Sequence, residues 1–274
     1  LTIYIEEEPQ LDSSMLASVG LTVIDLTTGK NIIHEVYSKK TDRNLALDET
    51  SRFINSYDPK EIVLYLKTSK GAKKKKKNTK ILEQSDIINR LGIKGKNYKW
   101  KKDVTSSIFN SDYQDKFLEK IFEDTGMLTP LEYLHINRLP FASISYIIAL
   151  NYTHEHNPEI IKRINIPEVF NDSKHLLLGN DAVNQLNVVS NGTKKRKIDS
   201  LFDVINFTKT SMGRRLLKDY LIAPLTETNK IEERYEAIEQ MKKKDIYKKI
   251  QKEMIDMYDI ERLQRKLFLG ILKP

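Results

Sequence analysis

The 274-residue sequence contains no cysteine, and it has no apolar run long enough to cross a bilayer, which takes about 18 residues or more. The missing cysteines exclude disulfide bonds and cysteine-based zinc sites, and they favour an intracellular protein. The opening residues, LTIYIEEEPQ, are acidic, whereas a secretory signal peptide is basic and then apolar. We therefore expect an intracellular chain without a membrane partner; nucleus, organelle, bacterial cytoplasm and virus-associated locations stay open.

Sites for catalysis, cofactors and metals are also missing from the sequence. The G-x-x-x-x-G-K-S/T spacing that wraps a triphosphate does not occur, so we expect no ATP site within these residues. Asp25 follows a predicted strand, where a nuclease carboxylate would lie, but a two-metal nuclease needs several clustered carboxylates. A turn-stabilising role is the favoured interpretation. His154 and His156 point away from each other on a helix, which predicts an exposed helix end rather than a metal site.

Positive charge is concentrated in two short runs. The net charge is +8, and the runs 73–77 and 194–197 contribute nine positive charges, so the rest of the chain is almost neutral. The basic composition therefore says little about a broad DNA-binding face. The candidates for nonspecific phosphate contacts are Lys74, Lys75, Lys76, Lys195 and Arg196.

The first half of the chain has the pattern of an α/β domain. Residues 16–24 and 32–37 are rich in β-branched side chains and are joined by a Thr-Gly turn, which predicts a hairpin. A helix over 41–57, capped by Thr41 or Asp42, and a strand over 61–65 follow. We further expect a helix over 81–91 and an edge strand over 97–103 that carries Trp100. Together these elements predict a mixed sheet in a domain of residues 1–126.

Helical patterns dominate after residue 110. They predict helices over 111–122 and 129–136, the latter capped by Thr129, and a strongly apolar helix over 141–152. We place the domain boundary near residues 126–140, so that residues 127–274 form an all-α domain. The chain lacks an initiator methionine and opens within a predicted strand, from which we expect a piece excised from a longer protein.

The stretch 200–225 is the most distinctive part of the helical half. Its apolar residues recur every three or four positions, which predicts two short helices that each bury one face. Thr208, Thr210 and Ser211 suit the start of the second helix better than a helix interior, and Pro224 ends that helix. The predicted structure is a tight corner with a basic edge at Arg214, Arg215 and Lys218. On periodicity alone, a plain corner of an all-helical core is the favoured interpretation.

The amino-acid pattern of this stretch resembles the core-domain signature of the MutS family of DNA mismatch-repair ATPases. A second phrase of that family is matched by Arg234 and Glu239, and a third, Asp-x-Glu-Arg-Leu, by residues 259–263. Residues 20–29 resemble the hairpin of the ribonuclease-H-like connector domain, through Gly20, Leu21, Asp25, Leu26 and Gly29. The first phrase is matched by Ser200, Leu201, Phe202, Ile205, Thr208, Thr210, Met212, Gly213, Arg215, Leu216, Leu217, Pro224 and Leu225.

The resemblance implies a connector followed by the first part of a helical core that transmits between mismatched-DNA binding and an ATPase. The mismatch reader would precede Leu1, and the DNA clamp and ATPase would follow Pro274, so ATP and Mg²⁺ are expected only in the full-length protein. Implied partners are double-stranded DNA, a second MutS-like subunit and a downstream MutL-like repair protein. The candidate hinge residues are Thr208, Thr210, Met212, Gly213, Arg215 and Pro224.

Two alternatives from other classes stay open at this point. One is a ribonuclease-H-like nuclease or recombination factor, and the other is a protein–protein scaffold that recruits repair partners. Within the family, the resemblance does not separate the mismatch-repair branch from the recombination branch, or a homodimer from a heterodimer.

Overall fold

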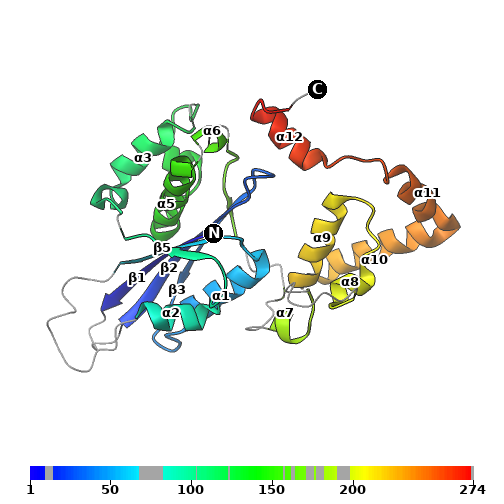
Figure 1. The fold of residues 1–274 in the computed structure, drawn as a ribbon, viewed down its shortest axis with the longest axis horizontal. Coiled ribbons are helices and arrows are strands. Elements are labelled where there is room, and N and C mark those ends of the chain that lie inside the picture. The colour runs from blue at the N-terminus through cyan, green and yellow to red at the C-terminus, as the bar shows by residue number, and fades with distance from the viewer. Residues whose placement is uncertain are drawn as a thin grey trace. The chain divides into compact units, whose positions relative to one another are not determined.

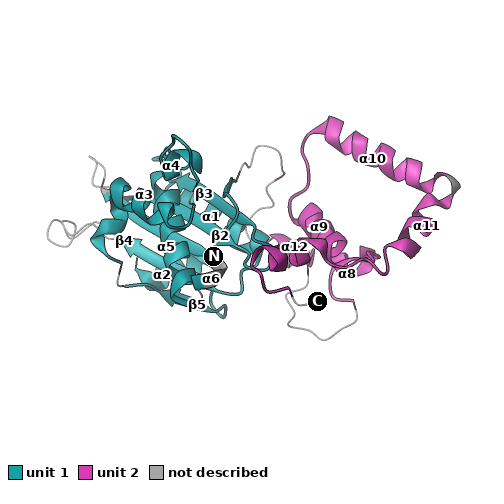
Figure 2. Cartoon of the chain, turned by 90° about the horizontal axis from the view of Figure 1, so that it is seen from above, with its two compact units in different colours: residues 1–170 teal, residues 171–274 magenta. Residues whose placement is uncertain are grey.

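The chain divides into two compact units, residues 1–170 and 171–274, which we call the α/β unit and the helical unit (Figure 2). The computed structural model describes residues 1–9, 15–67, 83–102, 104–122, 124–156, 158–161, 164–170, 176, 182–189 and 198–272. The candidate phosphate contacts Lys74, Lys75, Lys76, Lys195 and Arg196 lie outside the described residues.

A mixed sheet forms the centre of the α/β unit (Figure 1). It has six strands in the order β5-β4-β1-β2-β3-β6. Strand β2 pairs antiparallel with β1 and with β3, whereas β4, β5 and β6 each join the sheet in parallel. The expected hairpin and the expected edge strand with Trp100 are both confirmed. The strands are β1 (Thr2–Pro9), β2 (Met15–Ile24), β3 (Asn31–Tyr37), β4 (Ile62–Lys67), β5 (Tyr98–Trp100) and β6 (Glu168–Val169).

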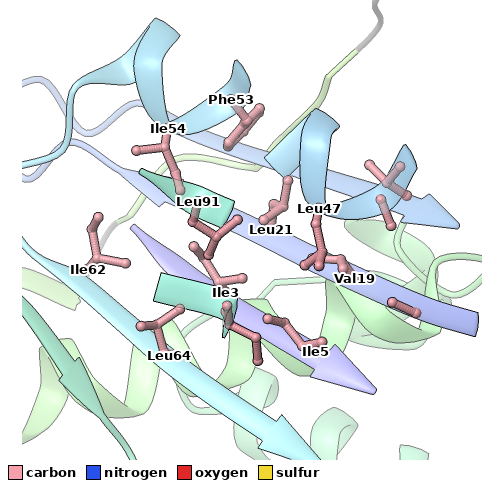
Figure 3. Packing of buried hydrophobic residues seen from close by; sticks show 14 of the residues in the cluster. Ile3, Ile5, Val19, Leu21, Leu47, Phe53, Ile54, Ile62, Leu64 and Leu91 are labelled. Atoms are coloured by element: carbon pink, nitrogen blue, oxygen red, sulfur yellow. The ribbon is translucent and has the colours of Figure 1, made fainter. Parts of the chain in front are cut away.

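Helices α1 (Leu45–Tyr57) and α2 (Gln84–Leu91) pack on one face of the sheet. Because strand side chains alternate between faces, Ile3 and Ile5 point to this core while Tyr4 points to the other. Figure 3 shows Leu47, Phe53 and Ile54 of α1 meeting the strand side chains.

Helix α1 begins four residues later than the sequence predicted. The expected caps, Thr41 and Asp42, are wrong, because the Asp42 carboxylate instead accepts a hydrogen bond from the backbone N–H of Asn44 (3.0 Å). Asn44 itself occupies the cap position without a side-chain bond to the helix. Asp42 thus stabilises the turn that leads into α1.

The opposite face is covered mainly by α5 (Pro140–His156), whose residues 142–150 are all buried. This burial explains the strongly apolar sequence of the helix, which ends in exposed residues 154–156 as expected. The predicted Thr129 cap is confirmed, because Thr129 and Glu132 form a reciprocal capping box. The remaining helices of this layer are η2 (Ser106–Phe109), α3 (Ser111–Glu119), α4 (Pro130–Tyr133) and α6 (Pro158–Ile161).

The division expected after residue 126 falls inside the α/β unit. Leu131 and Leu134 around α4 and residues 142–150 of α5 belong to the same core as Tyr4, Ile33 and Val63 of the sheet. Without them one face of the sheet would be exposed to water. The compact unit therefore continues to Phe170.

The first turn of α5 is fixed directly to the sheet. Gly20 of β2 lies under this turn, and a Cβ atom at Gly20 would come within 1.9 Å of the Phe141 carbonyl oxygen. On the neighbouring strand Glu35, paired with Gly20, accepts hydrogen bonds through Oε2 from the N–H groups of Phe141 (2.6 Å) and Ala142 (2.9 Å). A carboxylate suits these free donors and the positive end of the helix dipole.

The described residues of the helical unit form helices and no strand. An α/β part followed by a helical part agrees with the expected fold class. No helix in the described ranges of the whole chain is long and apolar enough to cross a membrane. The helices of this unit are α7 (Ala182–Gln185), α8 (Leu201–Ile205), α9 (Ser211–Ile222), α10 (Thr228–Lys242), η4 (Lys243–Asp245), α11 (Ile246–Glu253) and α12 (Ile260–Phe268).

Candidate functional site

The candidate site is the corner between α8 and α9, residues 200–225, which we call the signature corner. Ser200 caps α8: its hydroxyl oxygen accepts from the Asp203 N–H (3.2 Å), and its hydroxyl donates to Asp203 Oδ2 (2.8 Å). Asp203 Oδ2 also accepts from the Asp199 N–H (3.2 Å). The hydrogen bonds from Ser200 and Asp199 hold the pKa of Asp203 below its usual value, so the carboxylate stays charged near the positive end of the helix.

Thr210 begins α9. Its Oγ1 accepts a hydrogen bond from the N–H of Gly213 (3.0 Å), as expected for a helix N-cap. Thr208 lies two residues before Thr210, and its hydroxyl donates a hydrogen bond to Oδ1 of Asn206 (2.6 Å). A Cβ atom at Gly213 would lie 3.0 Å from Thr210 Oγ1 and 3.6 Å from Thr208 Cβ, so glycine leaves room for both threonines above the first turn.

The far end of α9 also agrees with the sequence. The helix ends at Ile222, two residues before Pro224, whose ring and missing N–H are incompatible with a continuing helix. The carbonyl oxygen of Pro224 accepts a hydrogen bond from the N–H of Leu176 (2.7 Å). Met212 lies half-buried in the first turn of α9.

Arg215 joins α9 to the start of α12. Its Nη1 and Nη2 donate to Oδ2 and Oδ1 of Asp259, both at 2.8 Å, and Nη2 also donates to Oε2 of Glu261 at 2.5 Å. We call Arg215, Asp259 and Glu261 the Arg215 latch. The two-point contact with Asp259 uses the planar fork of the guanidinium, which lysine cannot reproduce.

Asp259 is also the N-cap residue of α12. Its Oδ1 accepts from the N–H of Arg262 (3.3 Å) while the same carboxylate holds Arg215. The hydrogen bonds from Arg215 and Arg262 lower the pKa of Asp259 to about 2. The Asp259 bonds in turn raise the pKa of Arg215 above its usual range. Arg215 and Asp259 are therefore both charged at neutral pH.

Of two further arginine contacts, one joins the corner to α10 and the other lies within the corner. The Arg234 guanidinium of α10 lies 3.6 Å from the ring centroid of Tyr220 on α9. Arg214 of α9 lies 5.6 Å from the ring of Phe202 on α8. Both are cation–π contacts, in which the ring face attracts the positive charge.

The structure thus brings three separate sequence phrases together. Arg215 belongs to the first phrase, Arg234 to the second, and Asp259 and Glu261 to the third. The sequence indicated each phrase, but not that Arg215 pairs with a carboxylate 44 residues later. The role of the corner residues as a hinge stays a prediction.

Asp25, in the α/β unit, stabilises the β2–β3 turn. Its Oδ1 accepts from the N–H of Thr27 (2.8 Å), and its Oδ2 accepts from the hydroxyl of Thr28 (2.8 Å). Partial burial raises the pKa of Asp25, but the bonds from Thr27 and Thr28 outweigh it and the pKa lies below its usual value. Within the described ranges no group of three or more histidine and acidic side chains is placed to hold a metal ion.

Comparison with known proteins supports the resemblance seen in the sequence. Residues 181–274, which include the signature corner, match the family model of MutS domain III. The chain is 37% identical over 290 residues to a DNA mismatch repair protein MutS homologue of Acanthamoeba polyphaga mimivirus, and this alignment covers 100% of the chain. It is 27% identical over 259 residues to the DNA mismatch repair protein MutS of Caldanaerobacter subterraneus, covering 93% of the chain.

A mitochondrial DNA mismatch repair protein MutS homologue of the coral Sarcophyton glaucum is 26% identical over 269 residues and covers 87% of the chain. The chain spans only about a quarter of these relatives, namely 26%, 26% and 25% of their lengths. The similarity nevertheless extends through both units, from the sheet to the Arg215 latch. The chain belongs to the MutS family of DNA mismatch-repair proteins.

Proposed function

We propose that this chain is the connector and the first part of the helical core of a MutS-like mismatch-repair protein. In this role it transmits movement between mismatched-DNA binding and the ATPase of the full-length protein. Double-stranded DNA, a second MutS-like subunit and a MutL-like repair protein are the proposed partners, and ATP with Mg²⁺ is the proposed cofactor of the full-length protein. An intracellular location follows from such a role.

The strand order supports a ribonuclease-H-like connector. Three antiparallel strands, β3-β2-β1, are extended by the parallel strands β4 and β5, with α1 before β4 and α2 before β5. We propose that this connector comprises the α/β unit as far as Phe170, rather than ending at residue 126. The helical core then contains the residues that match MutS domain III.

A nuclease receives no support from the side chains in this sheet. On the face covered by α1, the central strand β1 contributes the apolar side chains of Ile3 and Ile5. These belong to the same core as Leu47, Phe53 and Ile54 of α1. The Asp25 carboxylate accepts hydrogen bonds from Thr27 and Thr28 within the β2–β3 turn. The acidic cluster that two-metal cleavage requires has no counterpart at these positions.

The observation that carries the proposal is the Arg215 latch. A bidentate ion pair resists both sliding and rotation, so a movement of α12 is passed to α9 and through the corner to α8. Helices α10 and α12 also carry large exposed apolar side chains, among them Tyr235, Leu267 and Phe268. Exposed apolar side chains of this size are typical of a surface that another polypeptide covers, which supports a core completed by further residues of the full-length protein.

The test uses the full-length protein with the substitution Arg215→Ala. We expect basal ATPase and mismatch affinity to stay within about twofold, while stimulation of the ATPase by mismatched DNA falls about tenfold, a usual size for coupling between sites. Arg215→Lys keeps the charge but not the fork, so its stimulation should be intermediate.

The matched control is Lys266→Ala, which removes an exposed positive charge from α12 without touching the latch. It should leave stimulation unchanged. Unchanged stimulation in Arg215→Ala, with its helical content intact by circular dichroism, would refute transmission through the latch.

A second test asks whether these 274 residues read DNA themselves. Binding to matched and mismatched duplexes is measured across a salt series. We expect weak binding that ignores the mismatch and fades steeply with salt, as phosphate contacts do. A mismatch preference that survives salt would place a DNA-reading site inside this chain and contradict a pure transmitter.

A further inference from the structure

Residues 164–170 pass around the outer edge of the sheet at the end of the α/β unit, and we call them the strap. Ile164 is buried in the core beneath α5, whereas Phe170 packs against the core beneath α1. The strap therefore crosses from one face of the sheet to the other beside β3, following α6 (Figure 1). The helical unit begins at the next residue, Asn171.

Few backbone interactions hold the strap. It pairs with β3 at only two positions, Ile32 with Glu168 and Ile33 with Val169, whereas β1 and β2 pair at eight. The N–H of Phe170 donates to the carbonyl oxygen of Ile33 (2.8 Å). So short a ladder makes local opening much easier than opening of the central strands.

Two side-chain contacts compensate for this short ladder. The Asn31 amide, almost fully buried, donates through Nδ2 to the carbonyl oxygen of Asn165 (2.5 Å). The Phe170 ring lies 5.0 Å from His34 and 5.3 Å from Phe53, edge-on to both, with Tyr57 at 6.4 Å. Edge-to-face contacts of this kind are favourable beyond the area they bury.

The other apolar side chains of the strap differ in burial, because Pro167 is buried. Ile166 and Val169 are 46% and 47% exposed, so neither fixes the segment to the sheet. Burial lowers the pKa of His34, so its ring is neutral at neutral pH and the aromatic site for Phe170 carries no charge. Docking of the strap thus depends mainly on Phe170, on Asn31 and on the buried Pro167.

We propose that the strap is a releasable anchor between the α/β unit and the helical unit. When it is docked, the polypeptide leaves the sheet at Phe170. When Phe170 withdraws, Ile164 stays in its core and the six residues after it join the connection, which adds roughly 20 Å of reach at about 3.3 Å per residue. The anchor thereby sets how far the helical unit can move without disturbing the sheet, whatever that unit binds.

The experiment measures docking within the 274-residue chain. Because the sequence has no cysteine, spin labels attach only at the exposed positions of Lys30→Cys and Val169→Cys, on the β2–β3 turn and on the strap. Distances come from double electron–electron resonance. We expect one short, narrow distance in the parent protein and a second, longer and broader one after Phe170→Ala, with the released fraction rising about tenfold from the lost apolar burial.

Two further variants make the result decisive. Ile166→Ala, an equally apolar truncation on the same strap, should leave the distances unchanged, and Phe170→Leu should give an intermediate released fraction. A broad distance in the parent protein, or identical distances in the parent and Phe170→Ala, would overturn the anchor. Loss of the Trp100 fluorescence signal of the folded sheet in both Phe170 variants would also overturn it, because the strap would then be inseparable from the sheet.

Discussion

The two units of this chain are stabilised in different ways. The α/β unit has two apolar cores, one on each face of its sheet. Among the described residues of the helical unit only Val188, Phe202 and Ile222 are buried apolar side chains. That unit is instead connected by directed contacts, chiefly the Arg215 latch and the Arg234–Tyr220 pair.

The difference teaches what each kind of contact can supply. Apolar burial contributes about 25 cal/mol per Å², so two continuous cores stabilise a unit strongly. A partly exposed ion pair contributes about 1 kcal/mol or less, but it fixes the relative position of two helices. The α/β unit is thus built as a rigid body, and the helical unit has a defined geometry with little stability of its own.

The strongest test of this comparison is to truncate the chain after residue 170 or after residue 126. A chain of residues 1–170 retains both cores of the sheet and should fold cooperatively. A chain ending at residue 126 loses α4 and α5 and exposes Tyr4, Ile33 and Val63, so it should not fold. Urea unfolding followed by Trp100 fluorescence distinguishes the two, since the only tryptophan lies on β5.

The outcome also decides where the connector ends. Cooperative folding of residues 1–126 would restore the boundary expected from the sequence and would show that α5 is dispensable for the sheet. Failure of residues 1–170 would show that the sheet depends on the helical unit, against the independence of the two units.

A pair of glycine substitutions compares packing in the two units. In Gly20→Ala the new methyl group meets backbone atoms of Phe141 and Ala142 at 1.9 to 2.8 Å, and backbone there cannot move without displacing α5. We expect a loss of about 3 kcal/mol in the free energy of unfolding of the α/β unit. In Gly213→Ala the nearest atom, Thr210 Oγ1, belongs to a side chain at 3.0 Å.

In α9 the methyl group also brings a gain in helix propensity of about 1 kcal/mol, which offsets the crowding of the cap. The net change for Gly213→Ala should therefore stay within about 1 kcal/mol. Urea unfolding by Trp100 fluorescence for the α/β unit and by circular dichroism for the helices checks both values. Similar losses in the two variants would contradict the contrast between a rigid core and an adaptable corner.

Local features were predictable from the sequence, and contacts between distant segments were not. The β2–β3 hairpin, the Thr210 cap and the stop at Pro224 each follow from residues adjacent in the chain. The apolar pattern of α5 predicted that the helix is buried, but not that it is buried against the sheet. The helical domain was therefore expected to begin at residue 127, whereas the helical unit begins 44 residues later, at Asn171. Arg215 was recognised from its phrase, yet its pairing with Asp259 depends on a fold that no local pattern encodes.

The last expected effects are two separate pH windows, one for each unit. Burial between Phe53 and Phe170 lowers the pKa of His34 from 6.5 to about 4. The unfolded chain therefore binds more protons than the folded one between these values, and the α/β unit loses stability as the pH falls from about 6.5 to about 4, by about 2 kcal/mol. His34→Phe keeps an aromatic ring at this position and should flatten the profile.

In the helical unit the corresponding group is Asp259, whose pKa falls from 3.8 to about 2 because it binds Arg215. Its contribution is present above about pH 3.8 and is lost as the pH falls through about 2, by roughly 1 kcal/mol or less for a partly exposed pair. Asp259→Asn can still cap α12 but removes the charge, so it should abolish this second window alone. If Trp100 fluorescence and circular dichroism reported one coincident transition that showed both windows, the two units would unfold as a single cooperative body, and the contrast between a core-stabilised and a latch-connected unit would fail.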